Sequence, residues 1–312
     1  MTVSLWQDTA SWPGEVEHRH VVADIPIVGG GIVGSLLALL LGQAGKSVIV
    51  LEAVQVAGCA SGRNAGHCIG GMRQNYHTFI DRHGRAQARE TRRFLIESRD
   101  WIWELCRQLD VPFERNGSRY LAIDEQEAVS LRLSAEALIA DGQDVEWHDA
   151  DPWERGFPGM LVQHGDMGLQ PYLLTTRIMH ASGALVIENS EVHAIEQIGD
   201  KVILRSKRAT VECRQAILAT NAYSRILHPY FRDKVFPTRA QAYATEPGPV
   251  RLFDTPTGTE DGFEYFRQLP DGRFLIGGYR DRFVDEEVGF GDETTPHLQA
   301  GLESWVTARF PE

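Results

Sequence analysis

Three glycines near the start of the chain have the spacing of a phosphate-binding loop. Gly29, Gly31 and Gly34 follow a short apolar run and form the pattern G-x-G-x-x-G. The first glycine permits a tight turn, the second lets the backbone approach a pyrophosphate, and the third lets a helix pack closely on a strand. Glu52 closes the next apolar run, where a carboxylate can accept hydrogen bonds from both hydroxyls of an adenosine ribose. These residue types in this order predict a dinucleotide site.

The elements that must position these residues are predicted by the same stretch. We expect a strand over residues 24–28, a helix over 32–44 and a second strand over 48–51. The first N–H groups of such a helix carry partial positive charge and favour phosphate. A strand, a helix and a strand in this order are typical of a doubly wound α/β sheet.

Composition limits the class of protein. The chain has 312 residues, of which 43% are hydrophobic and 24% charged, so its length fits one large or two ordinary globular domains. The formal net charge of −12 disfavours nucleic acid and acidic membrane as partners. The four cysteines are scattered and lack C-x-x-C spacing, which favours a reducing compartment. No metal site is expected.

The sequence predicts neither a secretory leader nor a membrane span. The first twenty residues lack an apolar core, and the longest apolar run, residues 36–41, is far too short to cross a bilayer. That run belongs to the buried helix predicted above. We therefore expect a cytoplasmic protein.

The loop after Glu52 is rich in small residues and reads G-C-A-S-G-R-N-A-G over residues 58–66. This loop, which follows a V-x-V-L-E strand, resembles the G-x-A-S-G-R-N-x-G signature of the D-amino-acid-oxidase-like FAD-dependent oxidoreductases. That family includes glycine oxidase, sarcosine oxidase and gamma-glutamylputrescine oxidase. The resemblance implies FAD as cofactor and a Rossmann-like, α/β FAD-binding domain interleaved with an antiparallel-sheet substrate domain, the architecture of D-amino-acid oxidase and glutathione reductase. An ordinary glycine-rich turn is the alternative.

The resemblance also implies which residues contact the cofactor. In the family the small-residue loop runs beneath the pyrophosphate and the flavin ring, and a later A-T-N turn lies over the pyrophosphate. A residue at the start of the following meander contacts adenine through its backbone. The positions of this chain that match are Ser61, Arg63, Asn64, Ala65, Gly66, Val192, Thr220 and Asn221.

The predicted domain limits follow the same comparison. We expect an N-terminal extension over residues 1–22 and a discontinuous FAD-binding domain over 23–95 and 150–235. The substrate domain is expected over 96–149 and 236–312. Members of the family continue with a further strand and a second glycine-rich stretch that closes over the flavin, and nothing in this chain matches it. The chain is therefore expected to be a fragment or a truncated product.

A long amphipathic helix is predicted after the flavin loop. Its apolar positions recur at helical spacing and include Phe94, Trp101 and Leu105. Its arginines recur at three- and four-residue steps: Arg82, Arg85, Arg89 and Arg92. These arginines form either an anion-binding face or a solvated face, and the solvated face is favoured in so acidic a chain.

Five residues are candidates to face the substrate: His67, Arg73, Tyr265, Arg267 and Tyr279. His67 lies near the predicted flavin edge and could tune the flavin or assist a proton transfer. Arg73 follows the flavin loop, and in related amine oxidases an arginine from this region holds an anionic substrate group. The other three lie on or beside predicted strands of the sheet that covers the flavin in relatives. Alternation along a strand places Tyr265 and Arg267 on one face. For each candidate, packing or solvent exposure is the alternative role.

The function implied is FAD-dependent oxidation of the C–N bond of an amine or amino acid. Hydride passes from the carbon beside a neutral amine to the flavin, and the resulting imine is hydrolysed. An oxidase would then form hydrogen peroxide. Two alternatives remain: a catalytically silent relative that acts as a binding protein, and a nicotinamide-dependent dehydrogenase. The residues do not distinguish one small amine or amino-acid substrate from another, and they leave the oligomeric state open.

Overall fold

The computed structural model describes residues 4–8, 19–72 and 74–311. The chain forms two compact units. Unit 1 comprises residues 1–64, 170–239 and 288–291, and unit 2 comprises residues 65–169, 240–287 and 292–312. The predicted domain limits lay at residues 95, 150 and 235. The boundaries between the two compact units fall at other residues, because residues 65–95 and 150–169 form helices and strands that pack within unit 2.

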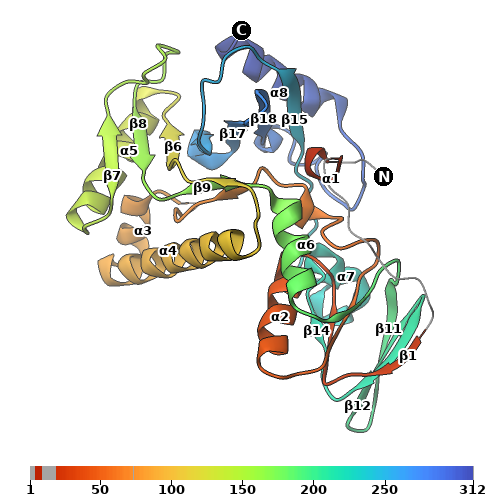
Figure 1. Ribbon diagram of the computed structural model, residues 1–312. Helices are drawn as coiled ribbons and strands as arrows, with labels where there is room; N and C mark the ends of the chain where they lie inside the picture. Colours follow the sequence, from red (N-terminus) through yellow and green to blue (C-terminus); the bar gives the residue numbers. More distant parts are fainter. Residues whose placement is uncertain (1–3, 9–18, 73, 312) are drawn as a thin grey trace. The chain divides into compact units, whose positions relative to one another are not determined.

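A four-stranded parallel sheet forms the centre of unit 1 (Figure 1). In spatial order its strands are β10 (Leu185–Ile187), β3 (Val48–Leu51), β2 (Ile25–Val28) and β14 (Ile217–Leu218). Every residue of β2 and β3 is buried, as expected for central strands of a parallel sheet that is covered on both faces. Helices α2 (Ile32–Gln43) and α6 (Pro171–Ala181) pack against each other beside it. The predicted strand–helix–strand order is confirmed.

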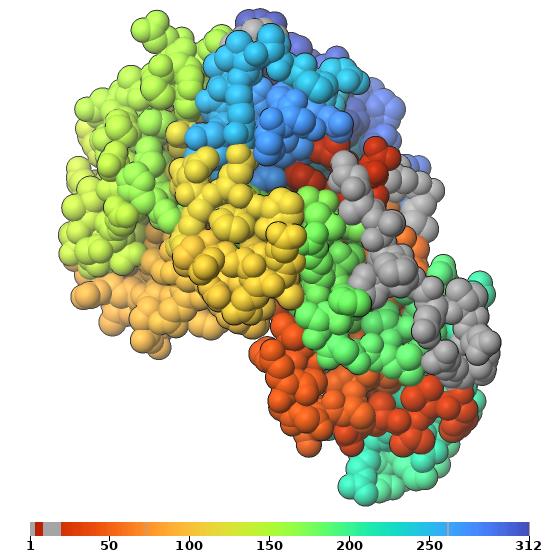
Figure 2. All heavy atoms as spheres, in the orientation of Figure 1, coloured from red at the N-terminus to blue at the C-terminus, as the bar shows by residue number. Residues whose placement is uncertain are grey.

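A second sheet of unit 1 contains the predicted meander. Strands β11 (Val192–Ile198), β12 (Lys201–Ser206) and β13 (Ala209–Cys213) are antiparallel neighbours. The turn between the first two is exposed at the lower edge of Figure 2, where the hairpin is drawn in teal. Strand β1 (Arg19–Val22) joins the sheet in parallel with β13, so the end of the expected N-terminal extension is part of a sheet. Helix α1 (Leu5–Asp8) buries Trp6.

A seven-stranded sheet dominates unit 2. In spatial order its strands are β15 (Ala242–Pro247), β18 (Arg273–Gly277), β17 (Glu264–Gln268), β16 (Thr257–Thr259), β6 (Ser118–Leu121), β8 (Met160–Gln163) and β7 (Val145–His148). All neighbouring pairs are antiparallel except β16 and β6, which are parallel. Helix α8 (Pro296–Arg309) packs on this sheet and contributes Trp305 to an aromatic core with Phe253, Phe266 and Phe274.

A smaller sheet of unit 2 contains β4 (His67–Cys68), β9 (Met167–Leu169) and β5 (Phe113–Glu114). Strands β5 and β6 flank the Asn116–Gly117 turn, yet they belong to different sheets. The turn therefore passes the chain from one sheet to the other.

The single long helix predicted after the flavin loop is wrong. Helix α3 (Tyr76–His83) ends at Gly84, whose φ of +81° breaks the helix, and α4 (Arg85–Gln108) begins directly after it. Helix α5 (Glu125–Ala140) follows later in the chain and packs on α3.

The buried face of α4 also differs from the prediction. Phe94 and Trp101 were expected in the core, but 66% and 40% of their surface is exposed. Arg92 and Arg99 are buried instead, because each has polar partners inside unit 2 that an apolar pattern does not register. A solvated face is therefore wrong for Arg92. Within the described part of the chain, no helix combines the length and the apolar character that crossing a bilayer requires.

Candidate functional site

The glycine loop of unit 1 lies between the end of β2 and the start of α2. Gly29 has a φ of +108°, and a Cβ on it would lie 2.6 Å from the Ala219 carbonyl oxygen. A Cβ on Gly34 would overlap the Gly29 carbonyl oxygen, so only glycine lets α2 pack this closely on the loop. A Cβ on Gly31 would lie 2.9 Å from Ser61 Oγ. The three glycines therefore keep the backbone bare at the start of a helix, as phosphate binding requires.

Glu52 projects from the end of β3 into the same loop. Its Oε2 accepts a hydrogen bond from the Gly30 N–H at 2.6 Å, and its Oε1 accepts one from the Val54 N–H at 2.9 Å. Burial raises the pKa of this carboxyl, and the backbone hydrogen bonds oppose that shift. Carboxylate oxygens only accept hydrogen bonds, which suits the two hydroxyls of a ribose. The carboxylate is therefore held in one orientation beside the glycine loop.

The small-residue loop is fastened to the helix start. Ser61 Oγ accepts a hydrogen bond from the Ile32 N–H at 2.9 Å, which places the hydroxyl at the first turn of α2. Arg63 Nε donates to the Gly58 carbonyl oxygen, and Asn64 Nδ2 donates to the Ala60 and Ser61 carbonyl oxygens. These side chains hold the loop in its own shape. Ala65 and Gly66 come next along the chain and belong to unit 2.

The remaining predicted cofactor residues also lie in unit 1. The Ala219–Thr220 peptide lies against Gly29, with the Thr220 nitrogen 3.5 Å from a Cβ position built there, so the A-T-N turn and the glycine loop are brought together. Asn221 has a φ of +47° and continues this turn. Val192 is buried at the first position of β11.

His67 and Tyr265 are brought together in unit 2. Their rings meet edge to face with centroids 5.9 Å apart. Burial, with a smaller contribution from the nearby Arg267 charge, lowers the pKa of His67 to about 3. The imidazole is therefore neutral at physiological pH, and its Nε2 is buried without a hydrogen-bond partner among the described residues.

Arg267 lies on β17 with its guanidinium directed at backbone. Its Nη2 donates to the Leu169 carbonyl oxygen at 2.8 Å and its Nη1 to the Gly66 carbonyl oxygen at 3.4 Å. Burial lowers its pKa to about 10, so it stays charged. A Cβ on Gly168 would overlap Nη1. This arginine joins the seven-stranded sheet to the small sheet of unit 2.

Tyr279 takes a separate place. It has a left-handed backbone with a φ of +63°, and the Arg282 guanidinium lies 4.0 Å from the centre of its ring. Its side chain packs against Gly301 of α8. No ring contact or hydrogen bond joins Tyr279 to His67 or Tyr265 within the described chain. Arg73 lies outside the described residues.

Sequence reasoning missed two buried carboxylates. Glu188, directly after β10, accepts a hydrogen bond from the Val56 N–H at 2.6 Å, and burial raises its pKa. Asp166 is fully buried in unit 2 and accepts from Arg99, from the Gly70 N–H and from Ser118. An acid that ends a buried strand was a signal for Glu188. No local pattern marked Asp166, whose partners come from distant segments.

Comparison with known proteins defines the class to which this architecture belongs. The model of a family described as FAD dependent oxidoreductase matches residues 24–312, so the chain belongs to this family. The predicted family, its fold and its cofactor, FAD, are confirmed.

Among individual proteins, gamma-glutamylputrescine oxidoreductase of Escherichia coli (strain K12) is 26% identical, and the alignment covers 85% of this chain and 66% of that protein. The L-proline dehydrogenase of P. horikoshii has the same fold, with a TM-score of 0.74, 16% identity and coverage of 95% and 78% of the two chains. Glycine oxidase from Bacillus cereus ATCC 14579 also has this fold, with a TM-score of 0.72 and 22% identity, and the alignment covers 93% of this chain and 78% of that chain. The alignments with the Escherichia coli relative and with two probable oxidoreductases cover 66%, 65% and 64% of the relatives' own lengths, so the chain spans just under two thirds of each.

Proposed function

We propose that this chain binds FAD through unit 1 and serves in the oxidation of the C–N bond of a small amine or amino acid. The observation that carries the proposal is the Glu52 carboxylate, which backbone N–H groups orient beside a glycine loop that tolerates no Cβ at Gly34. The substrate class is supported by the names of similar proteins, which refer to gamma-glutamylputrescine, proline and glycine.

The residues of unit 1 would hold the cofactor by charge and shape. The N–H groups at the start of α2 would meet the pyrophosphate, and Glu52 would accept the ribose hydroxyls. The Thr220–Asn221 turn lies on the same glycine loop, which supports its assignment to the pyrophosphate. Val192, Ser61, Arg63, Asn64, Ala65 and Gly66 remain assigned to the cofactor on the family resemblance.

Bound FAD supplies the acceptor for a hydride from the carbon beside a neutral amine. The protein need only position the substrate and exclude water from it. His67 suits this role because it stays neutral, so it can donate or accept a hydrogen bond without adding charge to the site. Tyr265 supports the His67 ring and is assigned with it to the substrate side. Arg73 and Tyr279 remain candidates on their positions in the sequence.

Arg267 fits a positioning role better than substrate binding. Two of its donors are used by the Leu169 and Gly66 carbonyl oxygens, and Gly66 directly precedes His67. We therefore assign Arg267 to fixing the strand that carries His67.

The cell compartment and partners follow from composition. We propose a cytoplasmic protein, because its four cysteines are scattered along the sequence and none lies in a C-x-x-C pair. A net charge of −12 supports small molecules rather than nucleic acid as partners.

The test is the visible spectrum of the purified 312-residue chain, followed by anaerobic addition of single amino acids and amines. We expect a flavin spectrum that glycine, proline, sarcosine or a putrescine derivative bleaches. A flavin spectrum that no amine bleaches would leave cofactor binding standing and overturn the oxidation of C–N bonds. A colourless protein that takes up no added FAD would overturn both.

A further inference from the structure

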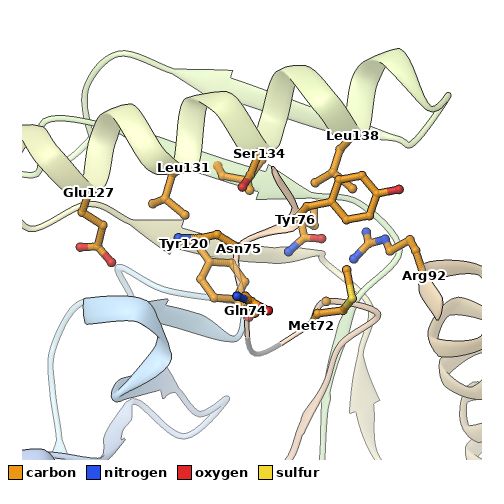
Figure 3. Close-up of a pocket in the computed structure, with 13 residues that line it drawn as sticks. Met72, Gln74, Asn75, Tyr76, Arg92, Tyr120, Glu127, Leu131, Ser134 and Leu138 are labelled. Carbon is orange, nitrogen blue, oxygen red and sulfur yellow. The ribbon is translucent and has the colours of Figure 1, made fainter. Parts of the chain in front are cut away.

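A small pocket in unit 2 lies outside the residues assigned to the cofactor or the substrate. It is bordered by α5 and by residues 71–72 and 74–76, with β6 and β8 completing the wall (Figure 3). Its volume is about 40 Å³, which is room for a few water molecules or one small organic molecule. Met72, Leu131, Leu138 and Leu161 supply an apolar wall.

Arg92 brings a positive charge to one end of the pocket, where Figure 3 shows its guanidinium directed inward. Only 5% of its surface is exposed. Its Nη1 donates to the Gly70 carbonyl oxygen at 2.6 Å, and its Nε donates to Gln143 Oε1 at 3.3 Å. No carboxylate of the described residues forms an ion pair with it. Burying a guanidinium without an ion pair is unfavourable. The Arg92 guanidinium also has N–H groups that take no part in its hydrogen bonds to Gly70 and Gln143.

Two neutral groups meet Arg92 at the same place. The Tyr120 hydroxyl makes no hydrogen bond to a described residue, and Gln163, only 3% exposed, has an Oε1 without a partner. The polar atoms of Arg92, Tyr120 and Gln163 come together beside Gly71. A Cβ built there would lie 3.4 Å from Gln163 Nε2, 3.5 Å from the Tyr120 hydroxyl oxygen and 3.9 Å from Arg92 Nη1. Three potential donors therefore surround one space beside a glycine.

The charge of Asp166 partly offsets the burial of Arg92, but this carboxylate forms no hydrogen bond with the cluster. Asp166 receives hydrogen bonds from Arg99, from the Gly70 N–H and from Ser118, and none from Arg92. Glu127 lines the pocket but accepts from the Ile123 N–H at the start of α5, and Figure 3 shows it at the end opposite Arg92. The N–H groups of Arg92 that form no hydrogen bond within the described chain thus remain open to a group from outside it.

We propose that this pocket binds a short-chain carboxylate. The carboxylate group would sit beside Gly71 and accept hydrogen bonds from Arg92, the Tyr120 hydroxyl and the Gln163 amide. A charged acceptor suits a guanidinium better than water does. The aliphatic tail would lie against Met72 and the leucines, which an inorganic anion would leave uncovered. None of the residues in this assignment is among those assigned to FAD, so the pocket is a separate site of unit 2.

The test is saturation-transfer NMR on the purified 312-residue chain with sodium acetate as probe and acetamide as the neutral molecule of the same shape. Gly71→Ala is the decisive variant, because its backbone does not require glycine and the new methyl fits at ordinary contact distances while occupying the carboxylate position. Gly248→Ala is the matched control, since a Cβ there has no neighbour closer than 3.7 Å and it lies outside the pocket. Equal melting temperatures would show that both variants fold.

We expect a saturable acetate signal in the wild type and in Gly248→Ala, no saturable signal in Gly71→Ala, and none with acetamide. Tyr120→Phe should weaken acetate binding roughly 2- to 10-fold, the effect of one hydrogen bond, whereas Tyr243→Phe, on β15, should not. An unchanged signal in Gly71→Ala would overturn the proposal, as would equal binding of acetamide or equal competition by chloride. No acetate signal in the wild type would show that the pocket holds water only.

Discussion

The glycine loop of unit 1 and the Arg92 pocket of unit 2 are built in opposite ways. In unit 1 the site consists of backbone, and the side chains of Glu52 and Ser61 orient that backbone. In unit 2 the polar groups are side chains. Arg92, Tyr120 and Gln163 lie on α4, β6 and β8, which are far apart in the sequence. A backbone site needs consecutive residues of a fixed pattern, whereas a side-chain site needs only that the fold bring its members together.

A backbone site and a side-chain site should also respond differently to substitution. A backbone site is disrupted by adding atoms to glycine, and a buried side-chain network is disrupted by removing charge. Both kinds of change alter the free energy of unfolding, which denaturation experiments measure.

Asp166→Asn should have the largest effect on stability. The carboxylate accepts from Arg99 Nη1 at 2.9 Å, from the Gly70 N–H at 2.9 Å and from the Ser118 hydroxyl at 2.7 Å, and it is fully buried. Removing its charge leaves Arg99 buried with a weaker partner, which should lower the free energy of unfolding by about 3–5 kcal/mol. Urea denaturation measures this, with Asp233→Asn as the exposed control. Equal midpoints for the two variants would contradict a buried charge network.

Gly34→Ala should destabilise the protein by about 1–3 kcal/mol, because the new methyl overlaps the Gly29 carbonyl oxygen and α2 must move. In an unconstrained helix the same change is stabilising by about 1 kcal/mol, so the sign of the effect is diagnostic. The control is Gly248→Ala, where the methyl meets no close neighbour. Thermal unfolding monitored by circular dichroism gives both values. A more stable Gly34→Ala variant would show that the loop does not need close packing.

The stability of the protein should depend on the protonation of His67. Its folded pKa of about 3 lies below the ordinary histidine pKa of 6.5, so between these values the unfolded chain binds a proton that the folded chain does not. Stability from this group is therefore complete above pH 6.5 and falls as the pH drops toward 3, by at most about 1.4 kcal/mol per pH unit. Urea unfolding of wild type and His67→Phe between pH 4 and 7 should show a shallower dependence in the variant. Parallel curves would place His67 in water.

Arg205→Gln should have the smallest effect. Arg205 pairs with Glu196 across the exposed β11–β12 hairpin, where solvent screens the pair. We expect no measurable change in the urea midpoint. A clear loss of stability would mean that this hairpin is more buried than the structure shows.

The same contrast explains how much the sequence predicts. The strand–helix–strand unit of residues 24–52 was predictable because glycine spacing, apolar runs and a terminal acid are local signals. The break at Gly84 was missed because one glycine in a helical pattern is often tolerated. Arg92 was assigned to the wrong surface of α4, since an apolar pattern cannot show that its guanidinium donates to the Gly70 carbonyl oxygen.

The substrate side shows the same limit. Strand alternation placed Tyr265 and Arg267 on one face, but only the fold shows that His67 packs on Tyr265 and that Arg267 donates to backbone carbonyl oxygens. These partners lie about a hundred or more positions apart in the chain. Roles that depend on such pairs could not be read from spacing.

The central claim is that Glu52 and the glycine loop bind FAD, and its most direct test is FAD titration of the cofactor-stripped chain, followed by flavin fluorescence. Glu52→Gln should weaken binding roughly 10-fold or more, because it replaces a charged acceptor of ribose hydroxyls with a neutral amide. Glu188→Gln is the matched control, as another buried carboxylate of unit 1 that accepts a backbone N–H. FAD bound tightly by wild type and Glu188→Gln and weakly by Glu52→Gln would confirm the site. Equal affinity in all three would contradict it.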